Sequence, residues 1–441
     1  MTDLETLTRA GDLRELNRWL DEAGTLEIAE ELARLAPPAK AVAFRLLGRD
    51  RALAVFEHLD PVHQQQVLEG LRDDRVRQLV EDMEPDDRAR LIGELPASVA
   101  TRVLSGLSPA QRAMTAALLG YPEESAGRIM SPEYVYLRES MTAADALERV
   151  RRAGAGAETV YMLPVTDDER RLQGVVSLRE VVLAPPEARI GELMTREVHR
   201  VHATDDQEVA ARLVQEAGLL ALPVLDSEDR LVGIITVDDA MHVIEAEDTE
   251  DVALHGATQP LGRPYLAASV IGVARSRAAW LLVLIAASAL TVNVLQLFED
   301  TLETMVTLAL FIPLITGTGG NTGAQASTVV IRAMAVGEVR FGDLPRVVGR
   351  EARVGVTLGA FLAVIGFVPV AVVFGADIAV VVSITLLATC TWATFAGSLL
   401  PMLARRAGVD PAVVSAPLIT TLVDATGLVI YFVVARAVLD V

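Results

Sequence analysis

The sequence predicts a multidomain membrane protein with an all-α superhelical N-terminal domain, a duplicated α/β module and an all-α bundle of five transmembrane helices. Three observations predict this: a 24-residue repeat near the start, motifs that recur 59 residues apart, and long apolar runs near the end. A chain of 441 residues has room for several domains. The predicted parts are a helical-repeat domain at 1–125, two α/β halves at 126–188 and 189–245, a connecting helix at 246–272, and the bundle at 273–441.

The charge is unevenly distributed along the chain. The net charge is -20, yet residues 265–441 hold ten arginines and ten acidic residues, so the whole negative excess lies in residues 1–264. Such a region lacks the basic face that nucleic acid or anionic lipid requires, and we expect no nucleic-acid partner. An acidic surface collects cations, although an ordinary solvated surface explains the composition equally well. The single cysteine, Cys390, excludes a disulfide or a thiolate cluster within the chain.

Four prolines mark the repeat in the first part of the chain. Pro37, Pro61, Pro85 and Pro109 follow one another at intervals of 24 residues. Proline suits the first turn of a helix, with the preceding residue as its cap. A fixed period of this length indicates stacked pairs of short helices that form a superhelix. Such arrays often serve as interaction scaffolds, but packing alone also accounts for the pattern.

The second part of the chain is a duplication of three motifs in the same order. The pairs are 130–132 (MSP) with 194–196 (MTR), 163–167 (LPVTD) with 222–226 (LPVLD), and 174–180 (GVVSLRE) with 233–239 (GIITVDD). This pattern resembles a tandem pair of CBS domains, a Bateman module, which implies regulation rather than catalysis. Many such pairs bind adenine nucleotides, and the matching residues are Ser177, Glu180, Thr236 and Asp239. A pair that only dimerises is the alternative.

An acidic stretch follows the duplication. Glu245, Glu247, Asp248, Glu250 and Asp251 lie on a predicted helix that runs from Val237 to about Ala268. This helix would connect the α/β module to the membrane.

Five apolar runs are long enough to cross a bilayer: 278–298, 305–331, 354–375, 378–404 and 413–434. Arginines flank the start of the first run and fill the connections after the second and fourth, whereas the other two connections hold none. Basic loops stay in the cytoplasm. We therefore expect a prokaryotic plasma-membrane protein whose soluble region is cytoplasmic and whose C-terminus is outside, with Arg436 as the one dissenting charge.

One acid, Asp424, lies in the middle of the fifth run. Inserting a charged side chain at this depth costs about 2.5–3.5 kcal/mol. The runs contain no Lys or Arg that could neutralise it, so a cation in a pore is the natural partner. A protonated Asp424, or one that caps a broken helix, is the alternative.

The second run contains Pro313 and then four glycines in seven residues, Gly317, Gly319, Gly320 and Gly323. This composition predicts an interrupted helix, which is tolerated at membrane depth only where it is buried or lines a cavity. A phosphate-binding loop is a weak rival, because no lysine follows the glycines. The polar residues Asn321, Thr322 and Gln325 could orient water around an ion.

The absent residue types narrow the choice of ion. The runs hold no histidine and one cysteine, which disfavours soft or borderline metals. Carboxylate, carbonyl and water suit a hard cation, and Mg²⁺ tends to keep its own waters. A symmetric dimer would place two copies of Asp424 around one axis.

With these features together, the chain resembles the MgtE family of magnesium channels and transporters over nearly its whole length. The most specific stretches are 313–323 (PLITGTGGNTG) and 408–427 (GVDPAVVSAPLITTLVDATG). The resemblance implies a homodimer whose pore is built from the second and fifth spans. It makes Asp424 the pore carboxylate, with Gly317, Gly319, Gly320, Asn321, Thr420 and Thr421 as lining or supporting residues.

The resemblance also implies that cytosolic Mg²⁺ closes the pore by bridging acidic faces of the repeat domain, the CBS pair and the connecting "plug" helix. The matching acids are Asp86, Asp87, Asp206, Glu208, Asp239, Glu247, Glu250, Asp251 and Asp410. Gly218 and His242 stand where members of the family can carry acids. ATP binding at the CBS pair is implied for some members.

The expected function is therefore Mg²⁺ conduction gated by cytosolic Mg²⁺, with the lipid bilayer and a second copy of the chain as partners. A proton-coupled divalent-cation transporter that uses Asp424 as a relay is one alternative, and a membrane-anchored CBS scaffold is another. An enzyme is not expected, because the sequence shows no nucleophile–base pair or catalytic metal cluster.

Overall fold

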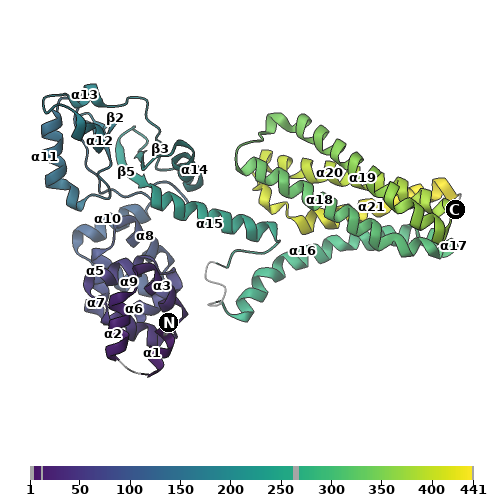
Figure 1. Ribbon diagram of the computed structural model, residues 1–441, viewed down its shortest axis with the longest axis horizontal. Helices are drawn as coiled ribbons and strands as arrows, with labels where there is room; N and C mark the ends of the chain where they lie inside the picture. Colours follow the sequence, from purple (N-terminus) through teal and green to yellow (C-terminus); the bar gives the residue numbers. More distant parts are fainter. Residues whose placement is uncertain (1–3, 11–12, 262–267, 440–441) are drawn as a thin grey trace. The chain divides into compact units, whose positions relative to one another are not determined.

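The computed structural model describes residues 4–10, 13–261 and 268–439 (Figure 1). The chain divides into two compact units, residues 1–247 and 248–441.

The first part of the first unit is helical throughout its described residues. Its helices are α1 (Leu4–Ala10), α2 (Leu13–Glu22), α3 (Thr25–Arg34), α4 (Pro37–Leu46), α5 (Arg49–Glu57), α6 (Pro61–Gly70), α7 (Asp73–Asp82), α8 (Pro85–Glu94), α9 (Ala97–Gly106) and α10 (Pro109–Leu119). The four repeat prolines each begin a helix, as predicted. The expected side-chain cap forms at Ser108, which accepts a hydrogen bond from the Gln111 amide, but not at Asp60 or Glu84.

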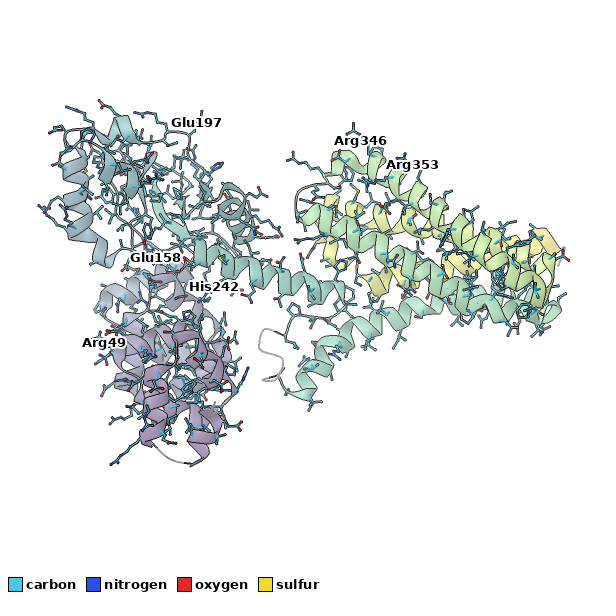
Figure 2. All side chains as sticks on the ribbon, viewed as in Figure 1. Arg49, Glu158, Glu197, His242, Arg346 and Arg353 are labelled. Atoms are coloured by element: carbon cyan, nitrogen blue, oxygen red, sulfur yellow. The ribbon has the colours of Figure 1, made fainter. Side chains whose placement is uncertain are left out.

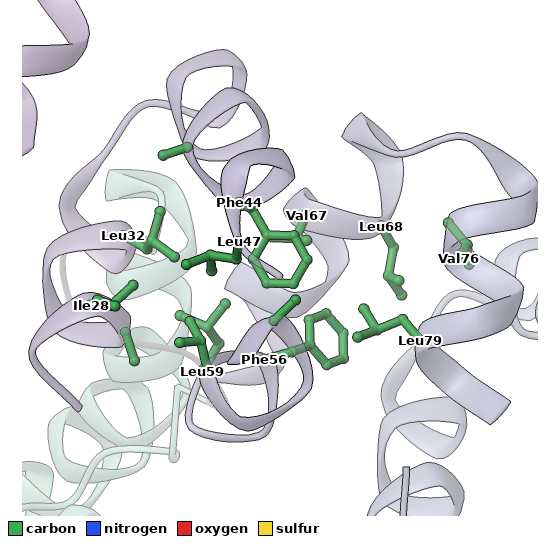
Figure 3. Close-up of a cluster of buried hydrophobic side chains, with 14 of the residues drawn as sticks. Ile28, Leu32, Phe44, Leu47, Phe56, Leu59, Val67, Leu68, Val76 and Leu79 are labelled. Carbon is green, nitrogen blue, oxygen red and sulfur yellow. The ribbon is translucent and has the colours of Figure 1, made fainter. Parts of the chain in front are cut away.

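The repeat helices share one continuous hydrophobic core (Figure 3). Phe44 of α4 and Phe56 of α5 meet edge to face, with ring centroids 6.0 Å apart. Leucines from successive repeats fill the space around them, and each buried side chain contributes about 1.5–3 kcal/mol. A polar contact also crosses this region, because the buried amine of Lys40 lies 2.8 Å from His63 Nδ1 and 2.6 Å from Gln66 Oε1.

The second part of the first unit contains two small sheets covered by helices. Its elements are α11 (Ala143–Ala153), β1 (Met162–Thr166), β2 (Leu172–Ser177), α12 (Leu178–Leu183), α13 (Ile190–Leu193), β3 (Val201–His202), α14 (Gln207–Ala217), β4 (Ala221–Leu225), β5 (Leu231–Thr236) and the start of α15 (Val237–His255). Strands β1 and β2 are antiparallel, and β4 pairs with β3 in parallel and with β5 antiparallel. The duplication predicted from sequence therefore appears as two hairpins in the same register.

The repeated motifs join the two halves to each other. Ser131, from the first half, pairs with Ile234 of β5, and Thr195 pairs with Val175 of β2. A side chain on Gly233 would overlap Met130 and the backbone of Ser131, and Gly174 is enclosed in the same way by the second copy of the motif. The motifs recur because each half supplies the segment that packs on the other half's glycine.

The connecting helix is shorter than predicted. We expected it to continue to about Ala268, but α15 ends at His255, and residues 262–267 lie outside the described part. Ala257 adopts a positive φ of 52°, the Thr258 amide donates to Ala253 O, and the Ala257 amide donates to Leu254 O. These two bonds form a Schellman motif, which satisfies the last carbonyls and turns the chain away from the helix axis.

The second unit is a helical bundle. Its elements after α15 are α16 (Val270–Leu297), α17 (Glu299–Thr304), η3 (Val306–Phe311), α18 (Ile312–Ala335), η4 (Phe341–Asp343), α19 (Leu344–Phe374), α20 (Ala376–Arg406), η5 (Pro411–Val413) and α21 (Ala416–Leu439). Among the described residues, four helical segments are long and apolar enough to span a membrane: α16, Phe341–Phe374, α20 and α21. The fifth predicted span, α18, is long enough but carries a row of glycines, threonines and amides.

Helix α18 packs against both α20 and α21, and α19 runs along α20 (Figure 1). One end of the bundle is closed by aromatic packing, where Phe298 stacks on Phe432 at 4.9 Å and Tyr431 donates to Leu308 O at 2.9 Å. Polar α18 is thus held in the bundle by its neighbours rather than by its own apolarity.

Candidate ion pathway and acidic cluster

The glycine-rich segment forms a continuous helix, so the predicted interruption is wrong. Helix α18 runs unbroken from Ile312 to Ala335, with Pro313 in its first turn, where proline needs no hydrogen-bond donor. The irregular backbone precedes it instead, as the 3₁₀ segment η3. Sequence propensity pointed to a break because glycine weakens an isolated helix, whereas here neighbouring helices stabilise the segment.

The glycines allow α18 to approach its neighbours closely. A side chain on Gly320 would overlap Thr420 and lie 3.2 Å from Asp424 Oδ1, both on α21. A side chain on Gly397 of α20 would overlap the carbonyl oxygen of Gly323. Small residues at such crossings are typical of helix packing in membranes. The predicted supporting residues Gly319 and Gly320 are therefore buried packing positions.

Asp424 lies at the α18–α21 contact. Its Oδ1 is buried and has no hydrogen-bond partner among the described residues, and the side chain as a whole is partly exposed. No ion pair within the described residues includes this carboxylate. A carboxylate in apolar surroundings is costly without a partner. The arrangement is one that a cation would stabilise.

Other predicted pathway residues lie along the same two helices. Thr420 and Thr421 donate hydrogen bonds back to α21 carbonyls, Ala416 O and Pro417 O, at 2.9 Å each, so their oxygens can still accept. Asn321 and Gly317 are exposed on α18, one helical turn apart, and nothing crowds Gly317. The structure thus gives α18 one buried glycine face and one exposed polar face.

A second group of carboxylates forms in the first unit. Asp86 and Asp87, in the first turn of α8, meet Asp239, in the first turn of α15. One oxygen of each carboxylate lies within 4.8 Å of the others. Asp239 accepts a hydrogen bond from Thr236 at 2.5 Å, and Asp87 pairs with Arg90 at 2.5 Å. Asp86 is 4% exposed, and its Oδ1 has no partner among the described residues.

Burial and mutual repulsion perturb this acidic cluster, which we define as Asp86, Asp87 and Asp239. Burial, and then the nearby charge of Asp239, raises the pKa of Asp86 well above its ordinary value. Burial likewise raises the pKa of Asp239, against the opposing hydrogen bond from Thr236. Such carboxylates resist ionisation together unless a cation neutralises them. Oxygen-only ligands of this kind suit Mg²⁺ or Ca²⁺.

Two further acids that sequence reasoning missed face this cluster. Burial, and then the charges of Glu84 and Asp239, raises the pKa of Glu158 to about 8. Burial and the charge of Asp87 raise the pKa of Glu84. Figure 2 shows Glu158 where the α/β part meets the repeat helices. Glu84 precedes the repeat proline and could have been included, but no motif points to Glu158.

Arg88 fixes the first turn of α8 through hydrogen bonds to neighbouring helices. Its guanidinium is 1% exposed, donates to Thr115 Oγ1 at 2.9 Å and to Met83 O at 3.0 Å, and therefore ties α8 to α10 and to the end of α7. The residues on either side of it, including Asp86 and Asp87, are held in place as a result.

The remaining predicted regulatory acids do not join this cluster. Asp206 caps α14, Glu208 pairs with Arg212 at 2.6 Å, and Glu247 accepts from Gln207 at 2.9 Å, all in the first unit. Glu250, Asp251 and Asp410 belong to the second unit, where Asp410 accepts from the Ala412 amide at 2.8 Å.

Gly218 and His242, the two departures from the family pattern, lie at the end of α14 and on the surface of α15. Gly218 has φ +61° and ends α14 in the left-handed conformation that favours glycine. His242 is exposed on α15 (Figure 2).

The four predicted nucleotide residues form two matching pairs. Ser177 and Glu180 cap α12 reciprocally, with Ser177 Oγ 2.7 Å from the carboxylate. Thr236 and Asp239 repeat the contact at the start of α15. The first pair is a capping box, which stabilises the start of α12, and the second shares its side-chain contact. A nucleotide would have to share these side chains with the caps.

Known protein families and curated relatives match this chain over nearly its whole length. The profile of the MgtE divalent cation transporters matches residues 312–434, that of the MgtE intracellular N domain matches 24–124, and that of the CBS domain matches 126–187 and 190–246. The magnesium transporter MgtE of Thermus thermophilus is 39% identical over 99% of this chain and 98% of its own length. That of Bacillus subtilis is 31% identical over 98% and 95%.

Solved structures agree with the sequence relatives. The cytosolic domain of the Mg²⁺ channel MgtE, crystallised in complex with ATP, covers 55% of this chain and 98% of that domain, with 38% identity and a TM-score of 0.52. The soluble part of a magnesium transporter aligns over 55% of this chain and 96% of its own, with 27% identity and a TM-score of 0.50. Because magnesium transporters 31% and 39% identical to this chain align over nearly its whole length, this chain belongs to the MgtE family of magnesium transporters, which are not enzymes.

Proposed function

We propose that the chain conducts Mg²⁺ through a pore lined by α18 and α21, with Asp424 as the ligand in the pathway. The observation that carries this proposal is the buried, unpartnered Oδ1 of Asp424 beside Gly320. Mg²⁺ dehydrates reluctantly, so the carboxylate and the polar side chains Asn321, Thr420 and Thr421 would contact its water shell. A homodimer would supply two such carboxylates to one divalent ion.

Mg²⁺ flux into vesicles containing the purified chain tests this pathway. We expect Asp424→Asn to abolish selective Mg²⁺ uptake, because the amide cannot offset the ion's charge. Asp377→Asn, which removes an acid from the turn at the start of α20, is the matched control and should conduct normally. Normal uptake by Asp424→Asn would refute the assignment, and uptake that requires a pH gradient would instead favour the proton-coupled alternative.

The acidic cluster supports a regulatory role for the same ion. Bound Mg²⁺ would neutralise Asp86, Asp87 and Asp239 and hold α8 against the start of α15, whereas loss of the ion would leave repelling carboxylates. Closure of the pore by cytosolic Mg²⁺ follows if this contact controls the helix that leads to the membrane. We expect Asp239→Asn to raise the Mg²⁺ concentration that half-inhibits flux. The uninhibited flux should not change, because Asp424 in the pathway is intact. An unchanged inhibition curve would contradict the sensor role.

The orientation and assembly complete the proposal. Arginine-rich connections support a soluble region in the cytoplasm of a prokaryotic cell and a C-terminus outside. Labelling of single cysteines introduced at either end, in a Cys390→Ser background, checks the orientation, and light scattering of the purified chain checks the dimer.

ATP at the CBS pair is a proposed ligand, since the related cytosolic domain was crystallised with it. Titration calorimetry with ATP, and its loss in Ser177→Ala or Thr236→Ala, tests that site.

A further inference from the structure

A groove opens on the outside of the bundle between α19 and α20. It has a volume of about 560 Å³, and its walls include Ala352 and Val356 from α19 and Leu387, Trp392 and Phe395 from α20. Its lining residues include neither Gly320 nor Asp424. The ion pathway proposed above therefore does not account for it.

The groove offers hydrocarbon contact and no spare hydrogen-bond donor. Trp392 Nε1 donates to Thr426 Oγ1 at 2.8 Å, and Thr391 Oγ1 donates to Leu387 O at 2.7 Å. The indole also stacks on Phe395, with centroids 5.6 Å apart. Since these polar groups are satisfied internally, a polar occupant would lose its own hydrogen bonds on entry. The hydrocarbon chain of a lipid therefore fits these walls better than a peptide does.

Three arginines follow one face of α19 beside this groove. Arg346, Arg350 and Arg353 are exposed and spaced four and three residues apart, so they form a stripe on the helix. Figure 2 shows Arg346 and Arg353 projecting away from α19. Arg346 lies 3.7 Å from Asp343, whereas neither Arg350 nor Arg353 forms an ion pair within the described residues. Arg353 precedes the groove residue Val356 by three residues, so these two side chains are neighbours on the surface of α19 and one end of the stripe adjoins the groove.

We propose that this groove and the arginine stripe bind one anionic phospholipid, with an acyl chain in the groove and the phosphate against Arg350 and Arg353. Basic groups next to an apolar surface between transmembrane helices are the usual elements of anionic-lipid sites. The acidic excess of residues 1–264 does not oppose this, because the stripe belongs to the membrane unit. A second copy of the chain is a poorer occupant, since a two-fold contact here would bring two arginine stripes together.

The three tryptophans of the chain allow a direct test. Replacing Trp19→Phe and Trp280→Phe leaves Trp392 as the sole fluorophore. The full chain would be reconstituted in vesicles of equal parts phosphatidylcholine and phosphatidylglycerol, with the bromine quencher on the acyl chains of one lipid or the other. We expect brominated phosphatidylglycerol to quench Trp392 more strongly than brominated phosphatidylcholine at the same fraction.

The arginines should set this preference. Arg350→Gln with Arg353→Gln should reduce the preference for phosphatidylglycerol about fivefold for each arginine, the equivalent of about 1 kcal/mol each. Arg275→Gln with Arg277→Gln, at the start of α16, is the matched control and should leave it unchanged. Ala388→Leu, which fills the groove without touching the arginines, should reduce quenching by both lipids and keeps the test open if the arginine variant does not reconstitute.

Three results would overturn the proposal. Equal quenching by the two lipids would indicate ordinary boundary lipid. A preference that survives loss of both arginines would place the anionic site elsewhere. Protection of Trp392 from both lipids, together with cross-linking between copies through α20, would show that a second copy covers the groove.

Discussion

Glu158 offers the sharpest test of the electrostatic repulsion around the acidic cluster, because it faces the cluster without belonging to it. Its ordinary pKa is 4.5, and burial with Glu84 and Asp239 raises the pKa to about 8 in the folded state. Below pH 4.5 the carboxyl is protonated in both folded and unfolded chains and costs nothing. As the pH rises towards 8, the unfolded chain ionises freely while the folded one resists, so the free energy of unfolding falls.

The structure sets the size of this effect. Each tenfold displacement of a proton equilibrium corresponds to about 1.4 kcal/mol, which gives an upper limit of about 5 kcal/mol for an isolated group with this pKa. Glu158 is partly exposed and shares the repulsion with Glu84, so solvent screening and coupling reduce the figure. We expect Glu158→Gln to stabilise residues 1–247 by about 2 kcal/mol at pH 8 without Mg²⁺, and by almost nothing at pH 4.5.

Urea unfolding of residues 1–247 at several pH values measures this difference, and a related cytosolic domain has been crystallised as a separate piece. Glu197→Gln, on an exposed side chain far from Glu158 in the same unit (Figure 2), is the matched control and should behave like the unaltered chain. Mg²⁺ should stabilise the unaltered chain more than Glu158→Gln at pH 8, because less repulsion remains to be neutralised. Parallel pH profiles for the two proteins would refute the reasoning.

Three further predictions concern packing and buried charge. Burial lowers the pKa of Lys40 from 10.5 to about 8, so the folded state bears the full cost of the charged amine below pH 8 and loses that cost between pH 8 and 10.5. Lys40→Met should therefore raise the free energy of unfolding at pH 7 by about 1 kcal/mol, after allowance for the lost contacts with His63 and Gln66. Urea unfolding should show a smaller increase at pH 10. Gly397→Ala should lower the thermal stability of the full chain in detergent by about 1–3 kcal/mol because the methyl group would overlap Gly323, whereas Gly317→Ala, in open space, should have no such effect. Arg88→Met should unfasten the first turn of α8 and weaken Mg²⁺ binding to residues 1–247 in calorimetry, while Arg90→Met, which frees Asp87 of its ion pair, should not weaken it.

Periodic features were predictable from the sequence because they depend on local chemistry. A proline begins α4, α6, α8 and α10 because its fixed φ suits the first helical turn, and the 24-residue interval repeats that signal. The CBS hairpins were equally visible, since Gly174 and Gly233 must both leave room for the other half's motif. The family resemblance implied that Asp424 is the pore carboxylate, where the residues alone left open a cation ligand or a protonated acid, and this assignment stays a proposal.

The wrong expectations arose where tertiary contacts override local tendencies. Glycines weaken a helix in isolation, yet in α18 Gly319, Gly320 and Gly323 are positions at which α20 and α21 touch it, so the helix continues. The end of α15 depends on Ala257 in a left-handed conformation, which residues other than glycine seldom adopt and which no sequence signal announced. Glu158 escaped notice because it meets Asp239 only after the chain has folded through both halves of the CBS module.

The two carboxylate sites pose opposite electrostatic problems with one kind of solution. Asp424 is a single acid whose cost comes from apolar surroundings, and a hydrated ion could offset it without losing its waters. In the acidic cluster the cost comes from crowding as well as burial, since three carboxylates lie within 4.8 Å and a fourth acid, Glu158, holds its proton to about pH 8. Protons therefore compete with Mg²⁺ at the cluster near neutral pH. Under the proposed function, acidifying the cytoplasmic side should weaken closure by Mg²⁺, and a closing concentration that did not change between pH 6.5 and about pH 8, as set by Glu158, would show that this cluster does not control the pore.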